Sequence, residues 1–108
     1  MHNLKREPTH PGRILNEDFL KPLGLSQTTL AKELNTTFRT VNEIVNEKRG
    51  ISPEMAMKLA RYFGTSAELW LNLQNQYDLY RIKARKPGIL ERIALRQIAQ
   101  EGGVRAGE

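Results

Sequence analysis

The sequence contains no cysteine, and its 108 residues include a single tryptophan. Without cysteine the chain has neither a disulfide framework nor a thiolate metal site, and we expect a cytoplasmic protein. No stretch approaches the ~20 apolar residues of a membrane span, so we expect no membrane contact. The opening residues MHNLKREPTHPGR have no apolar core, which argues against a secretory signal.

Histidine is also scarce, because His2 and His10 are the only two. Neither lies near acidic residues at ligand spacing, so we expect no zinc site. The adjacent acids Glu17 and Asp18 point about 100° apart around a helix and cannot easily share one catalytic site. No nucleophile–base pattern and no phosphate-binding glycine loop is present. We therefore expect a non-enzyme with no catalytic residue, metal, cofactor or small-molecule substrate.

The clearest pattern in the sequence is helical periodicity. Apolar residues recur every three or four positions between capping and stop residues, and no segment alternates as a strand would. Pro11 suits the first position of a helix that Pro22 and Gly24 close, and Thr65 to Glu68 match a capping box. The pattern predicts an all-α, five-helix domain. The expected helices span about 11–20, 26–34, 37–49, 52–63 and 66–85.

Residues 26–49, SQTTLAKELNTTFRTVNEIVNEKR, are the most informative stretch. Ser26 and Thr37 can each cap a short helix, because a hydroxyl accepts a hydrogen bond from an unpaired N–H of the first turn. Asn35-Thr36 suits a tight turn, and Gly50 is expected to end the second helix. The first helix of this pair has an apolar face, and the second helix of the pair has an apolar inner face and a polar outer face. This is the pattern of a DNA-reading helix-turn-helix.

Three further blocks carry a resemblance to a known family. They read HPG-x-I-L at 10–15, N-E-I-V-N-x-K-R at 42–49 and F-G-T-S-A-E-x-W-L-N-L-Q-x-x-Y-D-L at 63–79. Over about residues 10–80 the chain resembles the HigA-type (VapI-like) antitoxins, within the phage-repressor-like (XRE) helix-turn-helix class. Asn35-Thr36 and Thr37 depart from the pattern, since many members carry Gly-Val and Ser at these positions.

The resemblance implies an antitoxin of a type II toxin–antitoxin module. Such a protein forms a homodimer, binds double-stranded operator DNA of its own operon, and neutralises a cognate RelE-like (HigB-type) toxin that cleaves mRNA on the ribosome. The alternative is a solitary transcriptional repressor without a toxin partner. A helical enzyme or an RNA-binding domain is a more distant alternative.

Base contacts are expected from the outer face of the second helix of the pair. Arg can bond guanine O6 and N7, Asn can do the same on adenine, and Glu can accept from cytosine N4. The candidates are Thr37, Phe38, Arg39, Thr40, Asn42 and Glu43. The candidates for phosphate contacts are Gln27, Thr28, Asn46, Lys48 and Arg49. The alternative is a solvated helix face and, for the last two, a preference of basic residues for helix C-termini.

The fifth helix carries an aromatic stripe, which we expect at a dimer interface or in the core. The residues assigned to the dimer interface are Trp70, Tyr77, Leu79 and Tyr80. The basic run from Arg81 to Lys86 has three interpretations: a solvated helix end, a DNA-backbone contact or a toxin contact. A toxin that binds RNA is usually basic, and like charge disfavours the last of these.

Pro87-Gly88 marks a boundary, so we divide the chain into a helix-turn-helix domain at 1–86 and a tail at 87–108. Aliphatic residues in the tail predict a short amphipathic helix over 89–98 that packs on the dimer partner or on the fifth helix. We place the toxin contact in the N-terminal segment and first helix, around Leu4 to Phe19. The sequence alone gives neither the operator nor the toxin.

Overall fold

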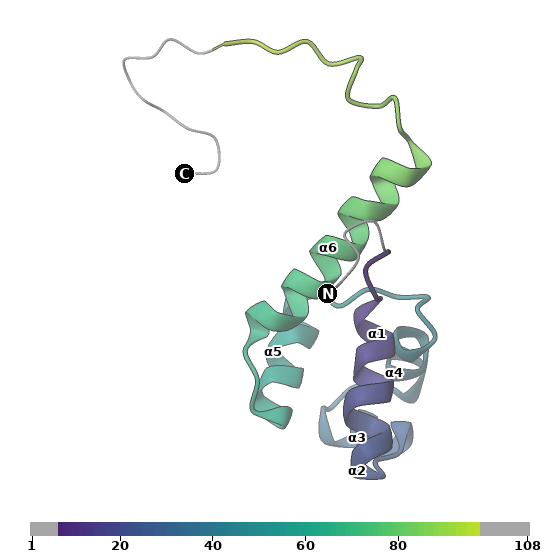
Figure 1. Cartoon of the computed structure of the whole chain (residues 1–108). Helices are drawn as coiled ribbons and strands as arrows, with labels where there is room; N and C mark the ends of the chain where they lie inside the picture. The colour runs from purple at the N-terminus through teal and green to yellow at the C-terminus, as the bar shows by residue number, and fades with distance from the viewer. Residues whose placement is uncertain (1–6, 98–108) are drawn as a thin grey trace.

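The computed structural model describes residues 7–97, and every regular element in that range is helical. The helices pack into a globule, and the second half of the last helix projects from it (Figure 1). This confirms the predicted all-α fold. The elements are α1 (Pro11–Ile14), η1 (Leu15–Leu20), α2 (Lys21–Leu23), α3 (Gln27–Glu33), α4 (Phe38–Val45), α5 (Pro53–Phe63) and α6 (Ala67–Arg85).

Four helices begin at a hydroxyl cap whose oxygen accepts from the backbone N–H three residues further on. The caps are Ser26 for α3, Thr37 for α4, Ser52 for α5 and Ser66 for α6. Each such cap contributes about 1 kcal/mol to stability. The capping box expected at Thr65 is wrong, because Ser66 is the cap and the Thr65 hydroxyl instead accepts from the indole N–H of Trp70 at 2.9 Å.

The elements α1, η1 and α2 form one unbroken helical stretch, so the end predicted at Leu20 is three residues too early. In the π-helical turn η1 the Lys21 N–H donates to the Asn16 carbonyl, five residues back. We attribute the tolerance of Pro22 in the last turn to this wider turn, because the proline has no N–H and its ring crowds a normal α-helical turn. Gly24 then ends the stretch at a φ of 61°.

The hydrophobic core lies between this first stretch, α3, α4, α5 and the first half of α6. Trp70 lies fully buried within it, and its ring centroid is 5.3 Å from that of Phe19, which in turn lies 4.7 Å from that of Phe63. The assignment of Trp70 to a dimer interface is therefore wrong, because a side chain with no exposed surface cannot contact a second chain. The other buried apolar residues are Leu15, Leu20, Leu30, Ala31, Leu34, Val41, Ile44, Ile51, Met55, Ala56 and Leu59.

Two glycines allow close approach between elements. A Cβ on Gly12 would lie 1.7 Å from the carbonyl oxygen of Ile44, so the start of α1 contacts the backbone of α4 directly. A Cβ on Gly50 would lie 3.0 Å from the side-chain amide of Gln74. That amide is buried, and its oxygen accepts from the Ile51 N–H at 2.8 Å. These contacts fix both ends of the α4–α5 connection against α1 and α6.

The second half of α6 and the segment after it carry exposed apolar side chains. Leu79 is 58% exposed and Ile82 is 47% exposed. After α6 the chain forms only turns between 87 and 93, so the helix predicted over 89–98 is not formed in the part of it that the structure describes. Its large side chains are exposed rather than packed on α6. They are Ile89, Leu90, Ile93 and Leu95.

Candidate nucleic-acid interface

The helices α3 and α4 form the predicted helix-turn-helix. Asn35 adopts the left-handed conformation with a φ of 58°, as predicted from its identity. The N–H of Thr36 donates to the Ala31 carbonyl at 2.9 Å, which closes the end of α3. Thr36 is half-buried, while Val41 and Ile44 bury the inner face of α4 in the core. The outer face of α4 is thereby left open to solvent.

The start of α4 presents the most exposed of the predicted base-contact residues. The Phe38 side chain is 51% exposed and the Arg39 side chain is 82% exposed. Thr37 and Thr40 lie beside them, and their hydroxyls bond each other at 2.9 Å while Thr37 also caps the helix. The cap leaves the Thr37 methyl group as the part of this side chain that is free for a contact.

A row of amides joins α3 to α4. The Asn42 amide nitrogen donates to the Gln27 side-chain oxygen at 3.0 Å, and the Asn46 amide nitrogen donates to the Asn42 oxygen at 3.2 Å. This row places two candidates for phosphate contact, Gln27 and Asn46, on either side of a candidate for base contact. Thr28 is exposed next to Gln27 in the first turn of α3.

Glu43 holds two arginines. The Arg39 Nε donates to one of its carboxylate oxygens at 3.0 Å, and Arg49 donates to the other from Nε at 2.9 Å and from Nη2 at 2.7 Å. These hydrogen bonds from Arg39 and Arg49 lower the pKa of the Glu43 carboxyl. Because both carboxylate oxygens are occupied, the structure indicates that Glu43 positions the arginines more readily than it meets a cytosine.

The end of α4 differs from the prediction. The helix stops at Val45, and Glu47 takes the left-handed conformation with a φ of 62° while the Lys48 N–H donates to the Glu43 carbonyl at 2.8 Å. The expected stop at Gly50 is therefore wrong. Lys48 and Arg49 lie in the connection to α5 rather than in the last helical turn, and both are exposed.

Sequence reasoning missed the role of His10. Its Nδ1 accepts from the Gly12 N–H at 2.9 Å, so the imidazole caps α1, and its ring meets Tyr77 edge-on with centroids 4.8 Å apart. Burial lowers the pKa of the imidazole, against opposing contributions from Glu47 and Asp78. Only the neutral ring can accept this bond. The residue thus joins α1 to α6.

The remaining residues of the predicted dimer interface lie on the second half of α6. Leu79 is exposed, and Tyr77 and Tyr80 are half-buried. Tyr77 is already engaged within its own chain, because the Arg81 guanidinium lies 5.3 Å from its ring centroid and donates to its hydroxyl. Leu79 is therefore the strongest of the three candidates for contact with another chain.

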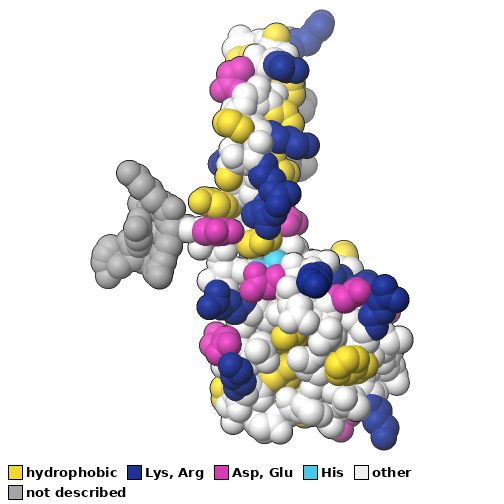
Figure 2. All heavy atoms as spheres, turned by 90° about the vertical axis from the view of Figure 1, so that its right-hand side faces the viewer, with side chains coloured by type: hydrophobic (Ala, Val, Ile, Leu, Met, Phe, Trp, Pro, Cys, Tyr) yellow, Lys and Arg dark blue, Asp and Glu magenta, His cyan; other side chains and the backbone are white. Residues whose placement is uncertain are grey.

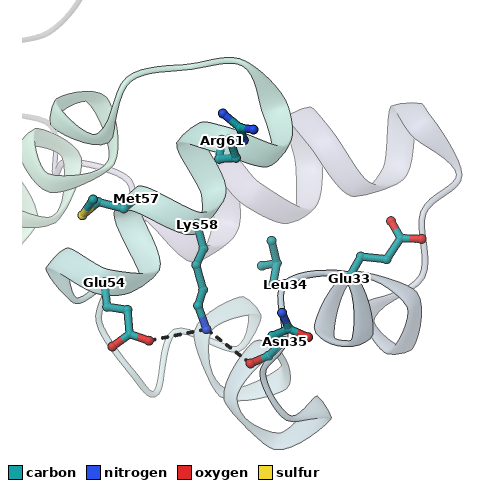
Figure 3. Close-up of a pocket in the computed structure, with 7 residues that line it drawn as sticks. All are labelled: Glu33, Leu34, Asn35, Glu54, Met57, Lys58 and Arg61. Carbon is teal, nitrogen blue, oxygen red and sulfur yellow. Dashed lines mark hydrogen bonds and ion pairs between the residues drawn. The ribbon is translucent and has the colours of Figure 1, made fainter.

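An open groove of about 370 Å³ lies between the helix-turn-helix turn and α5 (Figure 3). Of its charged groups, two point toward each other: the Lys58 ammonium contacts the Glu54 carboxylate at 3.5 Å and also donates to the Asn35 carbonyl at 3.3 Å. The groove offers no converging set of catalytic side chains. Between residues 7 and 97, no group of three metal-ligating side chains lies close together. No helix in that range is both long and apolar enough to cross a membrane.

A family model described as helix-turn-helix matches residues 17–70. The chain is 54% identical over 70 residues to virulence-associated protein I of Dichelobacter nodosus, and the match covers 65% of each protein. It therefore spans just under two thirds of that relative.

Solved structures that are similar over most of their length include two antitoxins. The antitoxin HigA of Pseudomonas aeruginosa with the higBA promoter is 43% identical, with a TM-score of 0.77 over 84% of this chain and 99% of HigA. The antitoxin GraA in complex with its operator is 37% identical, with a TM-score of 0.78 over 87% of this chain and 95% of GraA.

Proposed function

Because the chain belongs to the helix-turn-helix family and is similar to HigA over most of its length, we propose that it is an antitoxin of the HigA type. In this proposal the protein binds the operator of its own operon as a homodimer, represses transcription, and neutralises a RelE-like (HigB-type) toxin that cleaves mRNA on the ribosome. It has no catalytic step of its own.

The observation that supports DNA binding best is the outer face of α4. It carries an exposed arginine, a threonine pair and the central amide of the row that joins it to α3, and its inner face is buried. A helix of this kind fits the major groove, where each base pair shows a distinct set of donors and acceptors. The similar HigA and GraA chains are solved with promoter or operator DNA.

The contacts divide into two classes. Arg39 and Asn42 are proposed to read base edges, with Phe38 and the methyl groups of Thr37 and Thr40 against thymine methyls or sugars. Glu43 holds Arg39 in place. Phosphate contacts set the position of α4 in the groove without reading the sequence. They are assigned to Gln27, Thr28, Asn46, Lys48 and Arg49.

Arg39→Ala tests the base-reading role. If the guanidinium bonds guanine at two atoms, the change should weaken operator binding by about 1–3 kcal/mol and relax the preference at one base position. The measurement is a salt-titrated binding curve on the native promoter and on a scrambled duplex of equal length. Equal loss on both duplexes would remove Arg39 from the base-reading set.

Lys48→Ala is the matched comparison, because it removes one cation from the same surface without removing a base contact. It should weaken binding evenly on both duplexes and lower the salt slope by about one. An unmodified protein that binds the promoter no more tightly than the scrambled duplex would contradict the proposed repressor function.

The toxin contact is proposed for the N-terminal segment and the first helical stretch, around Leu4 to Phe19. Leu4 lies outside the described residues, whereas Phe19 packs against Phe63 and Trp70 and can contribute only its partly exposed edge. Co-expression with the product of the neighbouring gene should therefore yield a complex, and truncation after Lys86 should leave that complex intact. A truncated chain that still dimerises and binds DNA but loses the toxin would assign neutralisation to the tail.

A further inference from the structure

The positive charge of the chain is concentrated at one end. Residues 7–80 contain eight Lys and Arg against nine Asp and Glu, so the described part of the globule is close to neutral. Residues 81–97 contain six Lys and Arg against the single acid Glu91. The attraction between cations and phosphates supplies most sequence-independent DNA affinity. In the reading domain the cations assigned to phosphate contacts are Lys48 and Arg49, and a larger group of cations follows that domain.

We define the basic arm as the six cations of this segment. They are Arg81, Lys83, Arg85, Lys86, Arg92 and Arg96. All but Arg81, which is half-buried against Tyr77, are exposed. The four ion pairs found between residues 7 and 97 all lie within the globule, so no carboxylate neutralises the arm there.

The root of the basic arm is held on the side of the molecule that carries α4. Tyr77 packs edge-on against His10, which caps α1, and α1 contacts the α4 backbone through Gly12. Arg81 lies one turn after Tyr77 on the same face of α6, and Arg85 lies one turn after Arg81. Figure 2 views the side on which α4 lies in Figure 1, and Lys and Arg side chains follow the projecting arm on that face.

From this placement we propose that the basic arm binds the sugar–phosphate backbone of DNA next to the segment that α4 reads. The proposal rests on the DNA binding proposed above and adds a second contact surface to it. The arm supplies affinity without sequence preference, whereas α4 supplies the sequence preference. A basic toxin is disfavoured as the partner by like charge. An anionic membrane shares the charge preference, but it offers no reason for the root of the arm to be held on the side of α4.

The test neutralises the arm and measures the salt dependence of DNA binding. The variant carries Lys83→Gln, Arg85→Gln, Lys86→Gln, Arg92→Gln and Arg96→Gln, and it retains Arg81 because that residue contacts Tyr77. The control carries Arg61→Gln, which removes an exposed cation from α5. Both are compared with the unmodified chain on promoter and scrambled duplexes, and light scattering checks that the oligomeric state is unchanged.

For every arm cation that contacts a phosphate, the slope of log affinity against log salt should become about 0.9 less steep. If two arm cations contact phosphates, the slope changes by about 1.8. Lowering the salt from 1 M to 0.1 M would then strengthen DNA binding roughly 60-fold less in the arm variant than in the unmodified chain, on both duplexes alike. The control slope should not change. An arm variant with the slope of the unmodified chain would overturn the inference. If the arm variant keeps the DNA slope of the unmodified chain but no longer binds phosphatidylserine vesicles, the inference is also overturned, and the arm is assigned to lipid binding.

The design separates the two proposals. Loss of promoter preference in the unmodified chain contradicts the repressor function, whatever the arm does. A retained preference with an unchanged slope in the arm variant contradicts the arm contact alone.

Discussion

Leu79→Asp is expected to convert a dimer into a monomer and to weaken operator binding by at least about a hundredfold, because joined binding modules gain about 10²–10⁴ over single ones. One helix-turn-helix reads only a few base pairs, and recognition in this class needs two copies about 34–36 Å apart. Leu79 and Ile82 lie three residues apart on the exposed side of α6, where a carboxylate would face the partner's apolar surface. Light scattering and a promoter-binding curve measure the two effects.

Leu23→Asp is the matched control, since Leu23 is also an exposed leucine but lies at the end of α2, away from the arm. Leu23→Asp should leave the mass of the protein measured by light scattering unchanged. A Leu79→Asp protein that remains dimeric would move the interface away from α6. A monomeric unmodified protein at concentrations that saturate the operator would contradict the dimer itself.

Gly12→Ala should lower the free energy of unfolding by about 1–3 kcal/mol or more, the usual cost of forcing extra atoms into a packed core. The added Cβ would overlap the Ile44 carbonyl oxygen, which accepts the Glu47 N–H at 2.9 Å in the turn that ends α4. Backbone on both sides prevents the relaxation that a flexible side chain would allow. Chemical denaturation followed by circular dichroism measures the change.

Gly88→Ala provides the comparison for this substitution. A Cβ at Gly88 meets no atom within 4 Å, so its stability should change by no more than about 0.5 kcal/mol. Equal effects at both glycines would show that Gly12 matters for chain flexibility and not for the contact with α4.

Much of the helical framework could be predicted from local sequence. Hydroxyl caps at Ser26 and Thr37, the left-handed Asn35 and the glycine stop at Gly64 each act within a few residues, so their identities carry the information. The outer face of α4 followed from periodicity in the same way. The candidate contacts on that face were therefore available from sequence, and their roles stay predictions until DNA binding is measured.

The features that sequence did not predict depend on side-chain contacts outside the periodic pattern of a single helix. The Glu43 carboxylate binds Arg49 across the end of a helix, and the buried Gln74 serves the backbone of Ile51, 23 residues earlier. Trp70 lies in the core, where the Thr65 hydroxyl accepts from its indole N–H, although its spacing fits an interface equally well. In the tail, sequence predicted a helix that the structure does not form in the part it describes. The apolar spacing suits a helix, but a short helix is not stable without a surface to pack on.

The amide row of Gln27, Asn42 and Asn46 bears on the proposed contact between Asn42 and a base. These side chains are hydrogen-bonded to each other in the free protein. If Asn42 bonds a base, the row already holds its amide in one orientation, so little rotamer entropy would be lost on docking. A wrong base that breaks the row would leave an amide without a partner, which costs about 1–3 kcal/mol.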